Sequence, residues 1–131
     1  MNKSMVFSIG NRLAPLCENR RAAFLQAWAI VKAGGVTMPV RGVTFGSRQE
    51  ALKRLATYAP EKIRTFLMPE TDNPADSHAV AVMVGVQNGR GYYKLGYIPA
   101  VNTGLAAAVR GRVSISVLAG DIHSARVRVR V

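Results

Sequence analysis

The apolar positions of residues 18–33 recur every three or four residues, which is the period of one face of an amphipathic helix. The positions that form this stripe are Phe24, Leu25, Ala27, Trp28, Ala29 and Val31. Gly34 and Gly35 follow directly and predict the end of the helix. Because Trp28 has apolar neighbours along the stripe, we interpret it as a core residue that anchors the helix. The alternative is a surface ring that stacks on a nucleic-acid base.

Later in the chain, apolar and polar side chains alternate over short stretches, as they do in β-strands. The stretches predicted as strands are residues 35–45, 63–68, 79–86, 92–98, 113–118 and 125–131. Two short helices are predicted between them. One opens at Ser47, a capping residue followed by Glu50, and the other covers residues 102–109. The pattern favours a mainly β domain with helices, in which the short strands form a small, partly closed barrel.

The composition fits one domain with a single core. The chain has 131 residues, of which 49% are apolar, and a chain of this length can bury enough surface for one stable core. Its 18 Lys and Arg against 7 Asp and Glu give a formal net charge of +11. Such an excess favours polyanionic partners, of which nucleic acid is the first candidate. An anionic membrane surface and an acidic protein are the others.

The single cysteine, Cys17, excludes an internal disulfide and a cysteine-based zinc site, so a reducing cytoplasm is the expected compartment. No apolar run reaches the roughly 18 residues that indicate a membrane span, and residues 1–15 lack the continuous apolar region of a signal peptide. We therefore predict no membrane partner and three segments. These are a flexible tail over residues 1–17, a lead-in helix over residues 18–35 and a β-barrel domain over residues 36–131.

A dense acidic turn occupies residues 70–78 of this otherwise basic chain. Its ionisable side chains are Glu70, Asp72, Asp76 and His78. These groups could hold a divalent metal or form an acid–base pair of carboxylates. However, Asn73-Pro74 is a strong turn former, and a metal-dependent nuclease would normally bring its carboxylates from separate elements. Phosphate-loop, dinucleotide-binding and nucleophile-elbow motifs are also missing from the sequence. We therefore predict a structured or ligand-contacting turn, no metal or cofactor, and no catalytic activity.

Basic side chains gather in two further parts of the sequence. Arg126, Arg128 and Arg130 alternate with valines, so strand geometry puts the three guanidiniums on one face. The second group consists of Arg41, Arg48, Lys53, Arg54, Lys62 and Arg64. Each group is either a solvated outer face or the lining of a groove for a sugar-phosphate backbone.

The side chains that could supply stacking surfaces for bases are Phe45, Tyr92, Tyr93 and Tyr97. By strand alternation, Tyr93 and Tyr97 lie on one face together with Leu95, and Tyr92 lies on the other face with Lys94. At least one tyrosine is therefore expected in the core.

Three separated motifs occur in order along the chain. They are Gly42-Val43-Thr44-Phe45 with Arg48-Gln49, the acidic turn and strand from Glu70 to Val82, and Gly96-Tyr97-Ile98-Pro99. Together they resemble the HIRAN domain, a small module of eukaryotic helicase-like DNA-damage-tolerance proteins that also occurs as free-standing bacterial and phage proteins. The resemblance covers residues 36–131. It implies an OB-like β-barrel, here with an N-terminal helix and two short helices, that binds the 3′-hydroxyl end of single-stranded DNA in DNA repair or replication.

The resemblance also implies roles for individual residues. Phe45 corresponds to a base-stacking aromatic, Asn73 and Asp76 to the turn that contacts the terminal nucleotide, and Tyr97 to a backbone or sugar contact. A carboxylate accepts a hydrogen bond from a hydroxyl but repels a phosphate, so Asp76 in a basic groove would select an unphosphorylated 3′ end. The DNA-binding residues predicted here are Phe45, Arg48, Asn73, Asp76, Tyr93, Lys94 and Tyr97.

Three positions depart from the family pattern. Ala100 stands where Lys or Arg is common, Gly46 where the eukaryotic protein has a second stacking aromatic, and Ala75 where an aromatic is common. We predict a non-catalytic module that binds single-stranded DNA or DNA ends, with a helicase or nuclease as a further partner. The alternative is a protein-interaction module, a phage or prophage accessory factor with only non-specific nucleic-acid affinity. That alternative predicts that the helix over residues 18–33 forms its surface, with Trp28 exposed.

Overall fold

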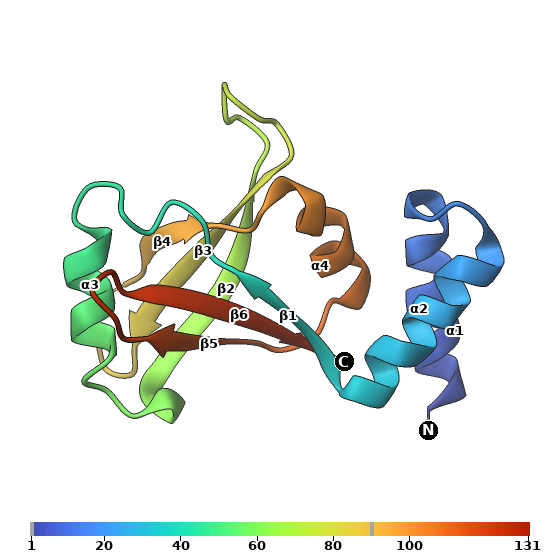
Figure 1. The fold of residues 1–131 in the computed structure, drawn as a ribbon, viewed down its shortest axis with the longest axis horizontal. Helices are drawn as coiled ribbons and strands as arrows, with labels where there is room; N and C mark the ends of the chain where they lie inside the picture. Colours follow the sequence, from blue (N-terminus) through green and yellow to red (C-terminus); the bar gives the residue numbers. More distant parts are fainter. Residues whose placement is uncertain (1, 90) are drawn as a thin grey trace. The chain divides into compact units, whose positions relative to one another are not determined.

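The structure, a computed structural model, describes residues 2–89 and 91–131 (Figure 1). These residues form two compact units. Unit 1 consists of the described residues up to Val36 together with residues 104–112 and 129–131, and unit 2 consists of residues 37–103 and 113–128. Among the described residues, no helix has the length and apolar character that a membrane crossing requires.

Unit 1 is built on two packed helices, α1 (Lys3–Leu13) and α2 (Arg20–Ala33), and contains most of α4 (Thr103–Val109). Helix α1 occupies the segment expected as a flexible tail. The side chain of Asn2 caps it by accepting a hydrogen bond from the Met5 amide at 3.0 Å. Its buried side is made by Val6, Ile9 and Leu13, whose spacing is that of one helix face.

Helix α2 confirms the helix predicted for this part of the chain. Asn19 caps its start by accepting from the Ala22 amide at 2.8 Å, and Gly34 ends it with a φ of +83°, a left-handed conformation that glycine adopts without strain. The buried face consists of Ala23, Ala27 and Ile30. The core prediction for Trp28 is wrong: this side chain is 47% exposed, because it lies on the outer flank of that face.

Unit 2 holds most of two three-stranded sheets. In the antiparallel first sheet, the order is β2 (Ile63–Glu70), β3 (Ala79–Val86) and β4 (Tyr93–Tyr97). In the second sheet, the order is β1 (Gly35–Pro39), β6 (Ser124–Arg130) and β5 (Val113–Leu118). Five of these strands occur where the alternating pattern predicts them, within about two residues at each end. The exception is β1, which is less than half as long as its predicted stretch.

The prediction of an OB-like β-barrel is wrong. In the described residues the six strands make two separate sheets, accompanied by four α-helices, and no closed barrel. Strand β1 ends at Pro39, which has no amide hydrogen to continue a ladder, and Gly42 then turns the chain with a φ of +79°. What remains of the expected continuation is a hydrogen bond from the Val40 amide to the carbonyl of Ala125 in β6, at 3.0 Å, and an isolated antiparallel bridge between Arg41 and Tyr97 of β4.

The segment between β1 and β2 carries helix α3 (Arg48–Leu55), which buries Ala51, Leu52 and Leu55. Ser47 precedes this helix as predicted, but its side chain makes no capping hydrogen bond, so the capping box is not formed. On β6 the predicted alternation is confirmed: Val127 and Val129 are buried, and Arg126 and Arg130 are exposed.

Candidate functional site

The acidic turn connects β2 to β3 and is ordered by its own side chains. The amide oxygen of Asn73 accepts hydrogen bonds from the backbone amides of Ala75 at 2.9 Å and Asp76 at 3.2 Å. Oδ1 of Asp76 in turn accepts from the His78 amide at 2.9 Å. Both are side-chain-to-backbone bonds of the kind that Asn and Asp make in turns. They fix the backbone that carries Asp76.

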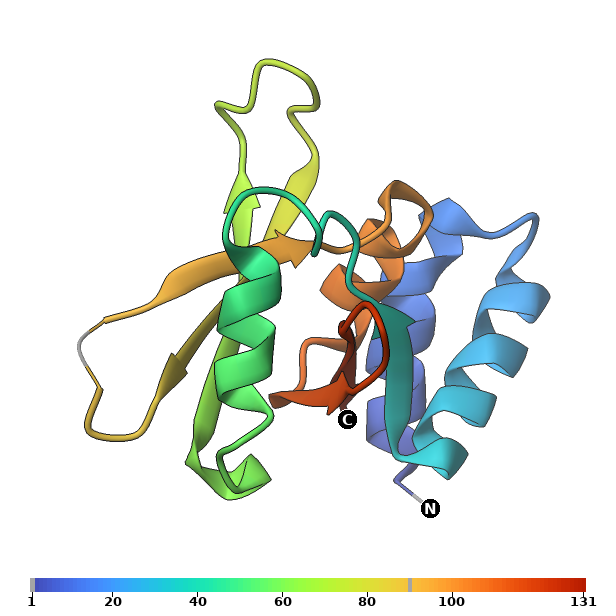
Figure 2. The same cartoon turned by 60° about the vertical axis from the view of Figure 1, so that its left-hand side comes forward.

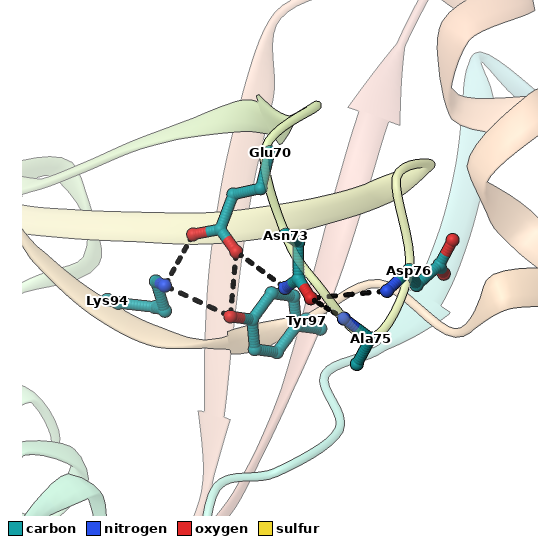
Figure 3. A network of polar contacts seen from close by, with 6 residues as sticks. All are labelled: Glu70, Asn73, Ala75, Asp76, Lys94 and Tyr97. Atoms are coloured by element: carbon teal, nitrogen blue, oxygen red, sulfur yellow. Dashed lines mark hydrogen bonds and ion pairs between the residues drawn. The ribbon is translucent and has the colours of Figure 1, made fainter.

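Glu70, at the end of β2, is the centre of a polar network beneath this turn (Figure 3). Its Oε1 accepts hydrogen bonds from the Tyr97 hydroxyl at 2.8 Å and from Nδ2 of Asn73 at 3.1 Å. Its Oε2 forms an ion pair with Lys94. The contact with Asn73 determines which end of that amide faces the turn, so Glu70 orients the acceptor that holds Asp76 in place.

A bulge in β4 brings Lys94 and Tyr97 to the same side of the strand. Val82 pairs with Gly96 and the next residue, Met83, pairs with Lys94, which leaves Leu95 as the extra residue. One extra residue reverses the alternation, so Nζ of Lys94 donates to the Tyr97 hydroxyl at 3.0 Å. The predicted grouping of Tyr93 with Tyr97 is therefore wrong. The grouping of Lys94 with Tyr92 is confirmed: the centroid of the Tyr92 ring lies 4.8 Å from that of Phe66, whose strand partner Met83 also pairs with Lys94.

The network shifts the ionisation of two of its members. Hydrogen bonds from Lys94, Tyr97 and Asn73 lower the pKa of Glu70 from the usual 4.5 to about 2, and the charge of Lys94 adds to the effect. The pKa of Lys94 is raised, chiefly by its hydrogen bonds with Glu70 and then with Tyr97. Both shifts favour the charged forms, because each charge has a partner of opposite sign.

Acid should therefore lower the free energy of unfolding, because it protonates Glu70. A carboxyl group whose pKa is lowered on folding stabilises the protein above its unfolded pKa, and this contribution is lost as the pH falls from 4.5 to about 2. We expect Glu70→Gln to reduce the free energy of unfolding at neutral pH by about 1 kcal/mol, the scale of a partly exposed ion pair with hydrogen bonds. Urea denaturation across this pH range should show the difference between variant and wild type shrinking towards pH 2.

The matched control for this experiment is Glu61→Gln, which removes an exposed carboxylate outside the network. Its urea midpoint should stay close to that of wild type at every pH. If wild type and Glu70→Gln instead lose stability in parallel as the solution is acidified, the network does not carry the acid sensitivity.

A pocket of about 240 Å³ lies beside the turn. Its walls are formed by Asn73, Ala75, Asp76, Ala79, Tyr97 and Ile98. Because Oδ1 of Asp76 is bonded to the His78 amide, Oδ2 is the oxygen left without a partner among the described residues. The lining of the pocket thus includes a carboxylate residue with one unpaired oxygen and a tyrosine whose hydroxyl Glu70 and Lys94 hold in place.

Arg48 connects this pocket to an exposed aromatic ring. Its guanidinium lies 5.9 Å from the ring centroid of Tyr97 and 5.3 Å from that of Phe45, both within the range of cation–π attraction. Nη1 of Arg48 also donates to the carbonyl of Gly42 at 2.8 Å. Phe45 is 73% exposed, so its ring is free to contact a ligand.

Of the seven residues predicted to bind DNA, the structure brings five together around a sixth, Tyr97. Tyr93 is the exception: it faces the opposite side from its strand neighbour Lys94, and the bulge places Tyr97 on the side of Lys94. It is 37% exposed, and burial of the ring raises the pKa of its hydroxyl, against the opposing charge of Arg54. Tyr93 therefore belongs to the neighbourhood of α3, which also carries Arg54.

Two features of the site were not predicted from the sequence. Glu70 was assigned to the turn, and its ion pair with Lys94 could not be read from strand neighbours, because β3 lies between the two strands that carry these residues. The bulge at Leu95 has one signal in the local sequence, the neighbouring Gly96, because an isolated glycine within a strand often marks a bulge or a close backbone approach. As for metal binding, the described residues contain no group of three or more His, Cys, Asp or Glu side chains arranged to hold a metal ion.

Comparisons with protein-family models, curated proteins and solved structures find no match to the chain. The functional argument therefore depends on the chemistry of the site.

Proposed function

We propose that unit 2 binds the 3′-hydroxyl end of single-stranded DNA without catalysing a reaction on it. The observation that carries the proposal is the pocket beside the acidic turn: Asp76 is one of its lining residues, and Oδ2 of this side chain has no hydrogen-bond partner among the described residues. A carboxylate oxygen accepts readily from a hydroxyl group and repels a phosphate group. In a chain of net charge +11, such an oxygen would distinguish a free sugar end from the rest of the polyanion.

The polar network supports this assignment because it holds the turn before any ligand arrives. Glu70 orients Asn73, and Asn73 binds the amides of Ala75 and Asp76. A site whose groups are already in position loses less conformational entropy on binding. The hydroxyl of Tyr97 is occupied by Glu70 and Lys94, so this residue offers its ring to a sugar or base rather than its oxygen.

The stack of Phe45 on Arg48 supports a path for the nucleotides next to the terminal one. An exposed aromatic ring contributes about 1–3 kcal/mol per stacked base. Exposed cations in the same unit, at Arg41, Lys53, Arg54, Lys62 and Arg64, would attract the phosphates. Gly46, which replaces a second stacking aromatic of the family pattern, has a φ of +59°, a conformation in which an aromatic residue would be strained.

Assignment to the HIRAN family is likewise a proposal, and the three ordered motifs support it. Residues from all three motifs meet at the site: Phe45 and Arg48 from the first, Glu70 to Asp76 from the second and Tyr97 from the third. A module of this kind would act in the cytoplasm on DNA ends, next to a helicase or nuclease in repair or replication.

The proposal is tested by fluorescence anisotropy with short, 5′-labelled single strands that differ only at the 3′ end. A strand with a 3′-hydroxyl should bind about tenfold more tightly than the same strand with a 3′-phosphate, the scale of one charge-assisted hydrogen bond. Equal affinities would show that the protein binds polyanions through its basic surface and does not distinguish the 3′ end. Failure of both strands to bind would exclude DNA as the ligand.

A further inference from the structure

Unit 1 carries an apolar groove that the proposed DNA site does not use. Helices α1 and α2 pack side by side (Figure 2), and a cavity of about 370 Å³ opens along one side of the pair. Its walls are Lys3, Val6 and Phe7 of α1 and Arg21, Phe24, Leu25 and Trp28 of α2. The residues from α2 follow the spacing of a single helix stripe, next to the stripe that forms the core.

The large side chains of this groove are unusually exposed for apolar residues. Leu25 is 61% exposed, Phe7 58% and Trp28 47%. Phe7 and Phe24 meet edge to face with ring centroids 5.3 Å apart, so the aromatic walls support one another. A contiguous exposed apolar patch of this kind, with charged residues at its edge, is typical of an interaction surface.

The charge around the groove is positive. Lys3 and Arg21 belong to its lining, and the guanidinium of Arg20 lies 4.9 Å from the centroid of the Phe24 ring. The sequence of unit 1 contains eight Lys and Arg residues against one carboxylate, that of Glu18. A partner therefore needs apolar side chains for the groove and negative charges for its rim.

We propose that this groove binds an amphipathic helix of a partner protein, with acidic residues on either side of its apolar stripe. A helix inserts side chains at positions i, i+3, i+4 and i+7 into a groove of this kind. With 11 residues in α1 and 14 in α2, the groove walls are about 15–20 Å long. That length matches three to four turns of a bound helix.

Other occupants fit the observations less well. A second copy of the chain would bring an equally basic surface to a basic rim. A lipid bilayer presents a flat surface, whereas this groove is concave and accepts protruding side chains. The phosphates of a nucleic acid would pair with the basic rim, but a nucleic acid has no aliphatic side chains to fill the apolar groove.

Trp28 is the one tryptophan of the chain, so its fluorescence reports on the groove directly. The probe is a synthetic, tryptophan-free helical peptide with leucines at helix-stripe spacing and glutamates elsewhere, titrated into the full-length protein. Binding should shift the Trp28 emission to the blue and protect it from acrylamide. The same peptide with lysines in place of the glutamates should bind at least tenfold more weakly.

Two variants and one control connect the signal to the groove. Leu25→Glu, at an exposed helix position, should lower the affinity for the acidic peptide by more than tenfold. Arg21→Glu should narrow or reverse the preference between the acidic and basic peptides. It should leave α2 intact, because an acid in the first turn suits the helix dipole. Val101→Glu adds the same charge at an apolar position of unit 2 that is 87% exposed. It should leave the affinities for both peptides unchanged.

The other outcomes would overturn the proposal. Equal binding of both peptides would show that the partner is not an acidic helix. If neither peptide bound while anionic phosphatidylserine vesicles shifted the Trp28 emission, the occupant would be a membrane surface and not a helix. If Trp28 were already shielded from acrylamide in the free protein, the occupant of the groove would be the chain itself. None of these results bears on the preference for 3′-hydroxyl ends, so the two proposals fail independently.

Discussion

Replacing Gly96 by alanine is expected to lower the free energy of unfolding by about 1–3 kcal/mol, the cost of overpacking a well-packed site, and to abolish binding to single-stranded DNA. Gly96 is buried, and a Cβ atom there would overlap the carbonyl oxygen of Arg41 and lie 2.7 Å from Cγ1 of Val40. Both neighbours belong to the segment that bridges to β4. The amides of Arg41 and Tyr97 each donate to the other's carbonyl at 2.8 Å.

The expected loss of binding follows from the position of Tyr97. This residue carries the ring that lines the pocket and contacts Arg48, and the bridge to Arg41 fixes its backbone. Moving the two segments apart would separate Arg48 and Phe45 from the acidic turn. Chemical denaturation measures the loss of stability. Hydrogen exchange at the amides of Arg41 and Tyr97 measures whether the two segments have moved apart.

A matched control distinguishes this steric effect from a general intolerance of glycine replacement. Gly46 has a φ of +59° and open space where a Cβ atom would lie, and asparagine is one of the few residues that tolerate this conformation. Gly46→Asn should therefore leave the denaturation midpoint almost unchanged. Slow exchange at both bridge amides in Gly96→Ala, with a wild-type midpoint, would show that the close approach of the backbones has no structural role.

Much of the fold was accessible from the sequence because local rules determine it. Asn19 and Gly34 mark the two ends of α2, and the alternation of valine and arginine places β6 correctly. The buried spacing of Val6, Ile9 and Leu13 in α1 obeys the same rule and could have been recognised. The expectation of a flexible tail gave too little weight to a short stripe near the start of the chain.

The predictions that were wrong concern how segments distant in sequence pair and pack with one another. Alternation indicates which face of a strand is buried but not which strand is its neighbour, so it could not exclude two sheets in place of a barrel. The stripe around Trp28 is wider than the contact that α2 makes, and the side chains at its edge stay exposed. At the site, the motifs identified Asp76 and Tyr97. Their connection through Glu70 depends on a bulge whose effect on the side-chain faces follows from the pairing of β3 with β4.

The largest functional effect is expected from Asp76→Asn, which should remove the preference for a 3′-hydroxyl over a 3′-phosphate. The substitution keeps Oδ1, so the bond from the His78 amide can persist and the turn should fold normally. It replaces the available carboxylate oxygen by an amide NH₂ group, which donates and does not accept. Affinity for the hydroxyl end should fall about tenfold or more, as a hydrogen bond to a charged acceptor is worth about 1.5–3 kcal/mol.

The same change should strengthen binding of the 3′-phosphate strand, because it removes a like charge and adds a donor at the point where the phosphate sits. Opposite changes for the two strands distinguish a direct contact from a loss of folding, which would weaken both. Asp72→Asn is the matched control: it removes the same charge from an exposed position of the same turn. It should raise the affinity for both strands slightly and equally, since its effect is long-range attraction alone. If Asp76→Asn behaves like Asp72→Asn, the acidic turn tunes only the charge of the surface, and the 3′ end is not recognised by Asp76.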